Sequence, residues 1–161
     1  MSEASDFANF YEAYAPKVRG LLFRLVGERY LLDLTQEAFL KAWEARDKFR
    51  GESHKATWLY RIAYNCAVDH PRKKSPVTSS LGPESYDETL EGDYSNKELA
   101  QMALASLSLE HRIVAVLFYF DELSLEEISA TLQIPGGTVK SRLNHARIKM
   151  NEFLKEKGVQ L

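Results

Sequence analysis

One run of side chains near the C-terminal end of the chain is well equipped to bind a nucleic acid. No acidic residue occurs between Pro135 and Met150. The apolar residues of this run recur at helical spacing and predict one buried face; they are Val139, Leu143, Ala146 and Met150. The other faces carry Lys140, Ser141, Arg142, Asn144, His145, Arg147 and Lys149. Such side chains bond to phosphates and to base edges in the major groove, so the run predicts a recognition helix.

A helix and a tight corner precede this run. Ser124 and Glu127 have the spacing of a capping box, which predicts a short helix that ends near Gln133. Residues 134–138 then form the corner, and the pair of helices predicts a helix-turn-helix. The alternative is a plain helical hairpin with a solvated basic face. The acid-free run, the capping box and the compact corner together favour DNA binding.

The elements that position this pair are also predicted to be helices. In the second half, one helix precedes Ser108 and a second is capped by it. In the first half, the apolar residues from Phe7 onward have helical rhythm, and Pro16 is predicted to begin a second helix there. A further helix follows Gly27, and Thr57 is predicted to cap another, which Pro71 ends. No segment alternates as a strand does, so the fold class is all-α.

The middle of the chain differs in composition from both halves. Residues 71–94 contain several prolines and glycines and few large aliphatic residues, and their charge changes from basic to acidic. This composition predicts a flexible acidic linker, here residues 72–95. The chain is therefore expected to hold two small helical domains, residues 1–71 and 96–161.

The overall composition excludes several classes of protein. The 161 residues carry a net charge of −2, so DNA binding is either weak alone or assisted by a larger partner. No apolar run approaches the ~20 residues of a membrane span, and the polar, acidic N-terminus does not resemble a signal peptide. The single cysteine, Cys66, excludes an internal disulfide and a multi-cysteine zinc site, and a cytoplasmic location is expected.

Catalysis is not expected either. The four histidines are scattered, and no metal-binding, phosphate-binding or nucleophile motif accompanies them. We therefore expect no enzymatic activity, catalytic residue, metal, cofactor or small-molecule substrate.

Two motifs resemble those of the extracytoplasmic-function sigma factors of bacterial RNA polymerase. Residues 123–128 with 134–143, Ala146 and Arg147 resemble the family's region 4. Residues 33–39 and 49–52, followed by 57–65, resemble region 2. Region 4 alone is weakly specific, whereas both regions in this order are highly specific. The resemblance covers nearly the whole chain and implies a sigma factor that directs core RNA polymerase to promoters through their minus-10 and minus-35 elements.

The resemblance also implies a polymerase-binding face. Asp33, Gln36 and Glu37 lie at i, i+3 and i+4, so they share one face of the predicted helix. Without the motif, a solvated face would be the default interpretation. The matching face of sigma factors binds the clamp helices of the largest polymerase subunit, and we expect the same of these three residues.

The DNA contacts implied by the resemblance fall in both halves. The expected minus-10 residues are Arg50, Ser53, His54, Lys55, Trp58, Arg61, Tyr64 and Asn65, with Asn65 at a position that helps to hold a flipped base. Trp58 is either a core residue or a stacking platform. The expected minus-35 residues are Thr138, Lys140, Ser141, Arg142, Asn144, His145 and Arg147. Of these, Arg142 and Arg147 either touch phosphate or brace the fold.

The chain departs from the family's pattern at three positions. His145 stands where the family usually has arginine, which affects the expected minus-35 sequence. Gln133 replaces a glycine common at the turn, where a left-handed backbone would cost about 1 kcal/mol. Pro71 interrupts a segment that commonly continues as a helix, so a shortened helix is expected there.

Two other functions remain as alternatives. A stand-alone helix-turn-helix regulator would bind DNA tightly without polymerase, ordinarily at a palindromic site. A sigma-like decoy would occupy a partner without starting transcription. Many relatives are also held inactive by an anti-sigma factor, which is a further expected kind of partner.

Overall fold

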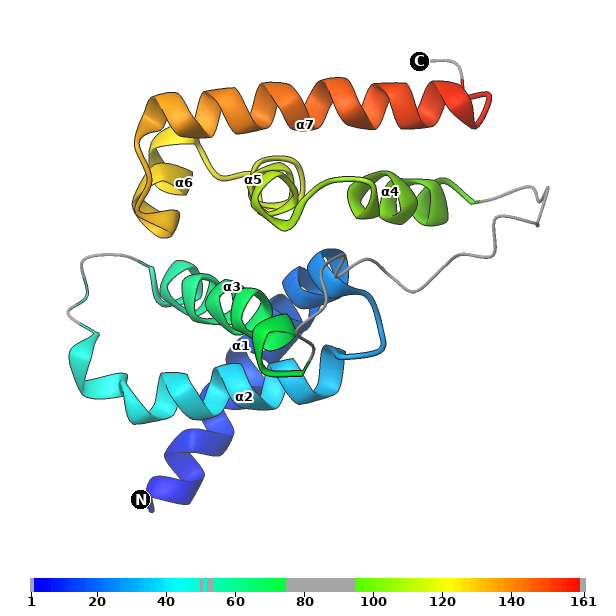
Figure 1. Ribbon diagram of the computed structural model, residues 1–161. Coiled ribbons are helices and arrows are strands. Elements are labelled where there is room, and N and C mark those ends of the chain that lie inside the picture. Colours follow the sequence, from blue (N-terminus) through cyan, green and yellow to red (C-terminus); the bar gives the residue numbers. More distant parts are fainter. Residues whose placement is uncertain (1, 50, 52–53, 75–94, 160–161) are drawn as a thin grey trace. The chain divides into compact units, whose positions relative to one another are not determined.

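The computed structural model describes residues 2–49, 51, 54–74 and 95–159, and these ranges contain helices and no strand. The first helices are α1 (Glu3–Val26), α2 (Leu31–Glu44), the short 3₁₀ helix η1 (Arg46–Lys48) and α3 (Lys55–Lys74). The later ones are α4 (Asn96–Ala105), α5 (Leu109–Tyr119), α6 (Leu125–Leu132) and α7 (Gly136–Glu156) (Figure 1). The predicted all-α class is confirmed. Each of the described helices is too short or too polar to span a membrane.

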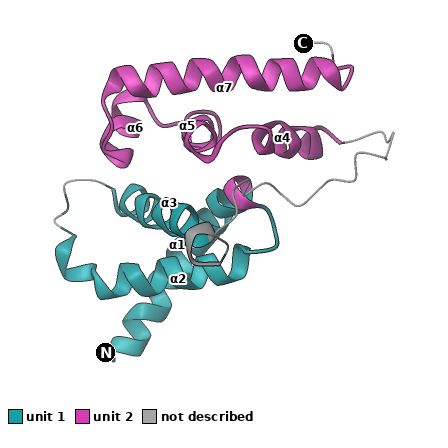
Figure 2. Ribbon diagram, in the orientation of Figure 1, with its two compact units in different colours: residues 1–23, 27–77 teal, residues 24–26, 78–161 magenta. Residues whose placement is uncertain are grey.

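The chain forms two compact units, which Figure 2 distinguishes by colour. One comprises residues 1–23 and 27–77, and the other comprises residues 24–26 and 78–161. Most of the predicted linker lies outside the described residues. Its first three residues, 72–74, continue α3, and Ser95 is the N-cap of α4.

Aromatic side chains join α1 to α2 in the first unit. The ring of Tyr11 lies 4.7 Å from that of Phe39, and the Phe10 ring lies 5.6 Å from it. Phe7 makes an edge contact with Trp43 at 5.1 Å. Such pairs contribute about 0.5–1.5 kcal/mol beyond the area that they bury. They fix the face of α2 that turns inward, and therefore also the face that stays in solvent.

Two predicted helix boundaries at prolines are wrong. Pro16 lies inside α1, which runs unbroken from Glu3 to Val26, and Pro71 lies inside α3, which continues to Lys74. At Pro16 the reason is visible in the packing, because the ring is exposed while Val18 and Leu21 beyond it are buried. Burial of that apolar stripe outweighs a proline cost of about 3 kcal/mol. For Pro71 the described structure gives no comparable reason.

The predicted cap at Thr57 is also wrong. The helix begins two residues earlier, at Lys55, so Thr57 lies in its first turn. The Thr57 hydroxyl donates a 2.7 Å hydrogen bond to the His54 carbonyl instead of accepting one from the backbone.

In the second unit, α7 packs along α4, α5 and α6 (Figure 1). Ile113, Val116 and Leu117 of α5 are fully buried, and Val139 and Ala146 of α7 are buried as well. Arg112 holds the segment between α4 and α5, because its guanidinium donates to the carbonyls of Leu107 at 2.6 Å and Ala105 at 3.2 Å. Burial lowers the pKa of Arg112 to about 10, so the group stays charged at neutral pH.

The predicted helix-turn-helix is present in α6 and α7. Ser124 accepts from the Glu127 amide at 3.1 Å, and the Glu127 carboxylate accepts from the Ser124 amide at 2.7 Å, which completes the capping box. Helix α6 ends at Leu132, and Gln133 adopts the left-handed conformation with φ 54°. The corner is shorter than predicted, because Gly136 and Gly137 already belong to the first turn of α7.

Candidate functional site

The solvent-facing side of α7 carries three of the predicted DNA-contacting residues. Lys140, Ser141 and Asn144 are exposed and lie within about one helical turn of each other. The opposite side, with Val139 and Leu143, is buried against the rest of the unit. The buried stripe therefore fixes which side of α7 faces a ligand.

Two glycines leave the N-terminal turn of α7 open. A Cβ atom added at Gly136 or Gly137 would meet nothing within 4 Å, and neither residue has a positive φ. Neither crowding nor backbone conformation in the unit requires glycine here. Glycine also permits close approach of a ligand to backbone amides, which are positively polarised at a helix N-terminus.

The two predicted arginines of α7 have partners within the unit. An Arg142 nitrogen lies 3.6 Å from a carboxylate oxygen of Glu110 in α5, and Arg147 Nε donates to the Tyr119 hydroxyl at 2.8 Å. In the described contacts, both arginines therefore brace α7 against α5. Thr138, another predicted DNA-contacting residue of this helix, is half-buried.

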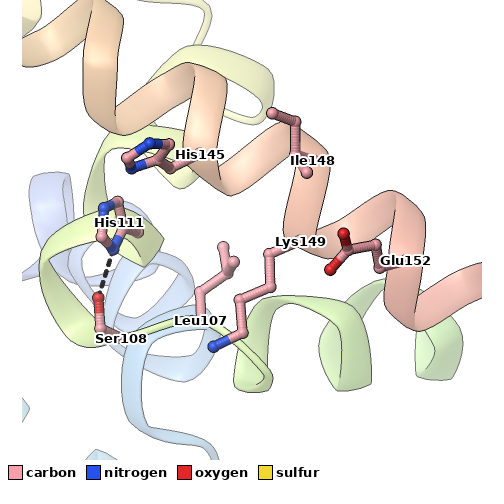
Figure 3. A pocket seen from close by; sticks show the side chains of 7 residues that line it. All are labelled: Leu107, Ser108, His111, His145, Ile148, Lys149 and Glu152. Carbon is pink, nitrogen blue, oxygen red and sulfur yellow. Dashed lines mark hydrogen bonds between the residues drawn. The ribbon is translucent and has the colours of Figure 1, made fainter.

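His145 lies beside a second histidine, His111 of α5, with ring centroids 5.7 Å apart (Figure 3). Both line a cavity of about 380 Å³. His111 Nδ1 is 2.6 Å from the Ser108 hydroxyl. Burial, followed by the charges of His145 and Arg142, lowers the pKa of His111. Sequence reasoning did not single out His111, because a separation of 34 residues gives no periodic signal that would pair it with His145.

The predicted minus-10 residues that are described gather along one side of α3. His54, Trp58, Arg61 and Asn65 recur at successive turns, which places them on one face. The half-buried Trp58 ring contacts that of Phe49 in a tilted arrangement, with the ring centroids 5.2 Å apart. Tyr64 is half-buried beside this face. Arg50 and Ser53 lie outside the described residues.

Lys55 has partners of its own at the start of this helix. Its ammonium group lies 5.6 Å from the Phe10 ring centroid and 5.9 Å from that of Phe49. Cation–π contacts of this kind contribute about 0.5–1 kcal/mol when exposed.

The third group of predicted residues lies on α2. Asp33 and Gln36 are exposed, and Glu37 forms a 3.0 Å ion pair with Lys41. The hydrogen bond that the Lys41 ammonium group donates to Glu37 in this pair raises the pKa of Lys41. Gln36 also borders an apolar groove of about 450 Å³, whose lining residues are Phe7, Ala8, Tyr11, Glu12, Gln36, Phe39 and Leu40. Leu40 is 59% exposed, so this face of α2 combines carboxylates with accessible apolar surface.

Across the part of the chain that the structure describes, no three histidine, cysteine or acidic side chains gather as metal ligands would. The chemistry that this chain presents is that of surfaces. They comprise an exposed polar side of α7, an aromatic and basic side of α3, and a partly acidic side of α2. Two units whose described residues are helical, one of them with a helix-turn-helix of this kind, are typical of the class of DNA-binding transcription proteins.

Comparison with known proteins identifies the family within that class. Residues 10–77 match the model of Sigma-70 region 2, and residues 93–150 match that of Sigma-70 region 4. The chain is 35% identical over 167 residues to the ECF RNA polymerase sigma factor SigW of Bacillus subtilis, with 93% of this chain and 89% of the relative covered. It is 36% identical over 150 residues to the ECF RNA polymerase sigma-E factor of Escherichia coli K12, covering 83% and 78%.

A solved structure agrees with these sequence matches. The sigma factor RpoE of Bartonella quintana, crystallised with the anti-sigma factor NepR, superposes with a TM-score of 0.73 at 26% identity. The match covers 93% of this chain and 97% of that one. This chain belongs to the extracytoplasmic-function sigma factors of RNA polymerase. That membership confirms the resemblance, and it agrees with the expectation that the chain is not an enzyme.

Proposed function

We propose that this chain binds core RNA polymerase in the cytoplasm and directs it to promoters with a minus-10 and a minus-35 element. The observation that carries the proposal is the presence of both sigma regions, in order, on a chain whose α7 has one buried side and one exposed polar side. The domains are residues 1–71 for polymerase and the minus-10 element, and residues 96–161 for the minus-35 element.

In this proposal α7 enters the major groove with its N-terminal half. Lys140, Ser141 and Asn144 contact base edges, and His145 lies at the border of that surface. Gly136 and Gly137 allow phosphate to approach the first backbone amides. Arg142 and Arg147 hold α7 against α5 through Glu110 and Tyr119 and contribute positive potential to the DNA backbone.

The side of α3 with Trp58, Arg61, Tyr64 and Asn65 takes the minus-10 element, together with Arg50, Ser53, His54 and Lys55. Single-stranded bases are held by aromatic platforms, amide hydrogen bonds and cations, and this side offers all three. Because the chain is 35% identical to named sigma factors, Asn65 is assigned the flipped base that the family motif implies.

Asp33, Gln36 and Glu37 form the polymerase-binding face. The groove beside Gln36 adds apolar area, so one contact surface combines charge complementarity with burial of Phe7 and Leu40. An anti-sigma factor is a further expected partner, since the similar RpoE of Bartonella quintana was crystallised with one.

The test is selection of DNA from sheared genomic DNA of the source organism. The chain alone, core polymerase alone and the two together are each incubated with the fragments, and the bound DNA is sequenced. We expect the mixture to enrich fragments that share two conserved blocks, and the chain alone to enrich none.

The other outcomes identify the alternatives. Enrichment of a palindromic site by the chain alone would show a stand-alone regulator. Binding to core polymerase without enrichment of DNA would show a decoy. Either result would contradict the proposed function.

A further inference from the structure

The cavity between α5 and α7 joins cationic and hydrogen-bonding groups from two elements. Its lining comprises Leu107, Ser108, His111, His145, Ile148, Lys149 and Glu152. In Figure 3 the rings of His111 and His145 lie next to each other, and the Lys149 side chain extends from α7 toward Leu107 and Ser108. Arg142 lies one turn before His145 on the same side of α7, held by Glu110.

The position of this cavity along α7 determines what could occupy it. Each residue adds about 1.5 Å along a helix, so Lys149 lies about 12 Å beyond Ser141. The major groove is about 12 Å wide. If Lys140 and Ser141 contact bases inside the groove, the turn of Lys149 therefore falls at the bordering strand. The groups that α7 and α5 present there face the sugar-phosphate backbone.

We propose that His111, His145 and Lys149 form a phosphate-binding cleft that holds the DNA backbone bordering the minus-35 element. This inference rests on the proposed function and adds α5 to the DNA-contacting surface. The residues that line the cleft come from both sides of it (Figure 3), and the Ser108 hydroxyl holds the Nδ1 edge of His111. The other ring nitrogen, Nε2, is then the one available to a phosphate oxygen. Glu152 marks the end of the cleft, because a carboxylate there repels a further phosphate.

Charge in the cleft makes this contact depend on pH. His111 faces His145, Arg142 and Lys149 from α7 and Glu110 from its own helix, and burial together with the nearby cations lowers its pKa. A phosphate has the opposite charge and favours the protonated ring, so binding DNA raises that pKa again. Proton uptake on binding means that affinity increases as pH falls.

The test uses the full chain bound to core polymerase and a promoter fragment recovered by the selection described above. Binding is measured by fluorescence anisotropy between 50 and 200 mM salt, at pH 7.5 and 6.0. The variants are Lys149→Gln and His111→Gln. Lys155→Gln is the matched control, since Lys155 is also exposed on α7 but lies beyond Glu152.

We expect Lys149→Gln to weaken binding about three- to tenfold and to reduce the salt slope by about 0.9, the loss of one phosphate contact. His111→Gln should weaken binding more at pH 6.0 than at pH 7.5, because only the protonated ring carries charge. Lys155→Gln should behave as wild type. Lys149 is exposed, so Lys149→Gln should leave the fold intact. That variant therefore still tests the cleft if His111→Gln lowers the melting temperature of the protein.

Two results would overturn the inference, and they have different meanings. If wild type binds the promoter fragment and both variants match Lys155→Gln, the cleft does not hold phosphate, while the proposed function stands. If the selection with the wild-type chain and core polymerase recovers no promoter fragment, the proposed function fails and the cleft fails with it.

Discussion

Around α7, single residues of similar chemistry have different surroundings. Lys140 is exposed, whereas Arg142 and Arg147 contact Glu110 and Tyr119. From sequence, all of them belong to one acid-free run, and their composition predicts a DNA-binding helix. The resemblance limits the residues that either touch phosphate or brace the fold to Arg142 and Arg147. Their partners Glu110 and Tyr119 could not be predicted, since these lie about 30 positions earlier in the chain.

Substitution of Gly137 should change stability and DNA affinity in opposite directions. Replacing it with alanine should raise the free energy of unfolding by about 0.5–1 kcal/mol, because alanine restricts the unfolded chain and meets no atom within 4 Å. The same methyl group should lower promoter affinity of the polymerase-bound chain, since it obstructs phosphate approach. Urea unfolding and anisotropy measure the two effects. An unchanged affinity would show that DNA does not approach this turn.

The polymerase-binding face can be tested on three side chains together. Changing Asp33, Gln36 and Glu37 to alanine should weaken binding to core polymerase at least about tenfold, which corresponds to about 1.4 kcal/mol. Asp47→Ala is the matched control, because it removes an exposed carboxylate from η1. Co-purification with core polymerase measures the effect. Equal loss in the control, or none in the triple variant, would contradict the assignment.

At the scale of elements, the sequence patterns predict the helices better than their ends. The capping box at Ser124 correctly predicts where α6 starts, because its hydrogen bonds are local. The prediction at Pro16 fails because tertiary packing decides it, and the prediction at Thr57 fails because the helix begins two residues earlier, at Lys55. In α1 the buried residues Val18 and Leu21 follow the proline, and their burial offsets the cost of keeping the proline inside the helix.

Pro16 therefore destabilises α1, and substitution of the proline should remove this cost in stability. Proline cannot donate to the Glu12 carbonyl, and its ring strains the helix. Pro16→Ala should stabilise the first unit by about 1–2 kcal/mol after allowance for the greater entropy of the unfolded chain. Thermal unfolding followed by circular dichroism measures this, with Lys17→Ala as the exposed neighbouring control. A lower melting temperature would mean that a proline-induced bend is required for packing.

The turn between α6 and α7 has a similar cost. Gln133 adopts φ 54°, a conformation that glycine accepts without steric penalty. Gln133→Gly should raise the free energy of unfolding by up to about 1 kcal/mol. Gln133→Val should lower it, because a β-branched residue fits this region poorly. Urea unfolding compares the three chains, and the reverse order would contradict a left-handed turn.

The start of α4 gives the chain a pH dependence. Hydrogen bonds from the Ser95 amide and hydroxyl, at 2.8 and 2.9 Å, lower the pKa of the Glu98 carboxyl below its ordinary value of 4.5. The folded state therefore prefers the ionised group. This contribution is complete above pH 4.5 and is lost as pH falls through the folded pKa.

Two variants test that contribution to stability. Glu98→Gln and Ser95→Ala should each reduce the fall in unfolding free energy between pH 5 and pH 3, roughly the range in which carboxyl groups titrate. The first removes the charge and the second removes one of its donors. Urea unfolding at several pH values measures the slope. A wild-type slope in both variants would show that the capping box does not select the ionised form.

At the scale of the whole molecule, the net charge of −2 is informative. A protein that holds DNA alone usually carries a basic excess, and here a basic excess is only local, as in the acid-free run between Pro135 and Met150. Sequence alone therefore predicts DNA binding that is either weak alone or assisted by a larger partner, and the family assignment agrees with assistance by a partner. The cleft formed by His111 and His145 could not be predicted, because it exists only when α5 and α7 are packed together.

Transcription start sites made by core polymerase with this chain on genomic DNA of the source organism give the most direct test that the chain is a promoter-specific sigma factor. We expect discrete starts that share one upstream pair of elements. Combined alanine substitution of Lys140, Ser141 and Asn144 should remove the dependence of these starts on the minus-35 element and leave their dependence on the minus-10 element. The absence of chain-dependent starts, or starts that share no upstream element, would contradict the proposed function.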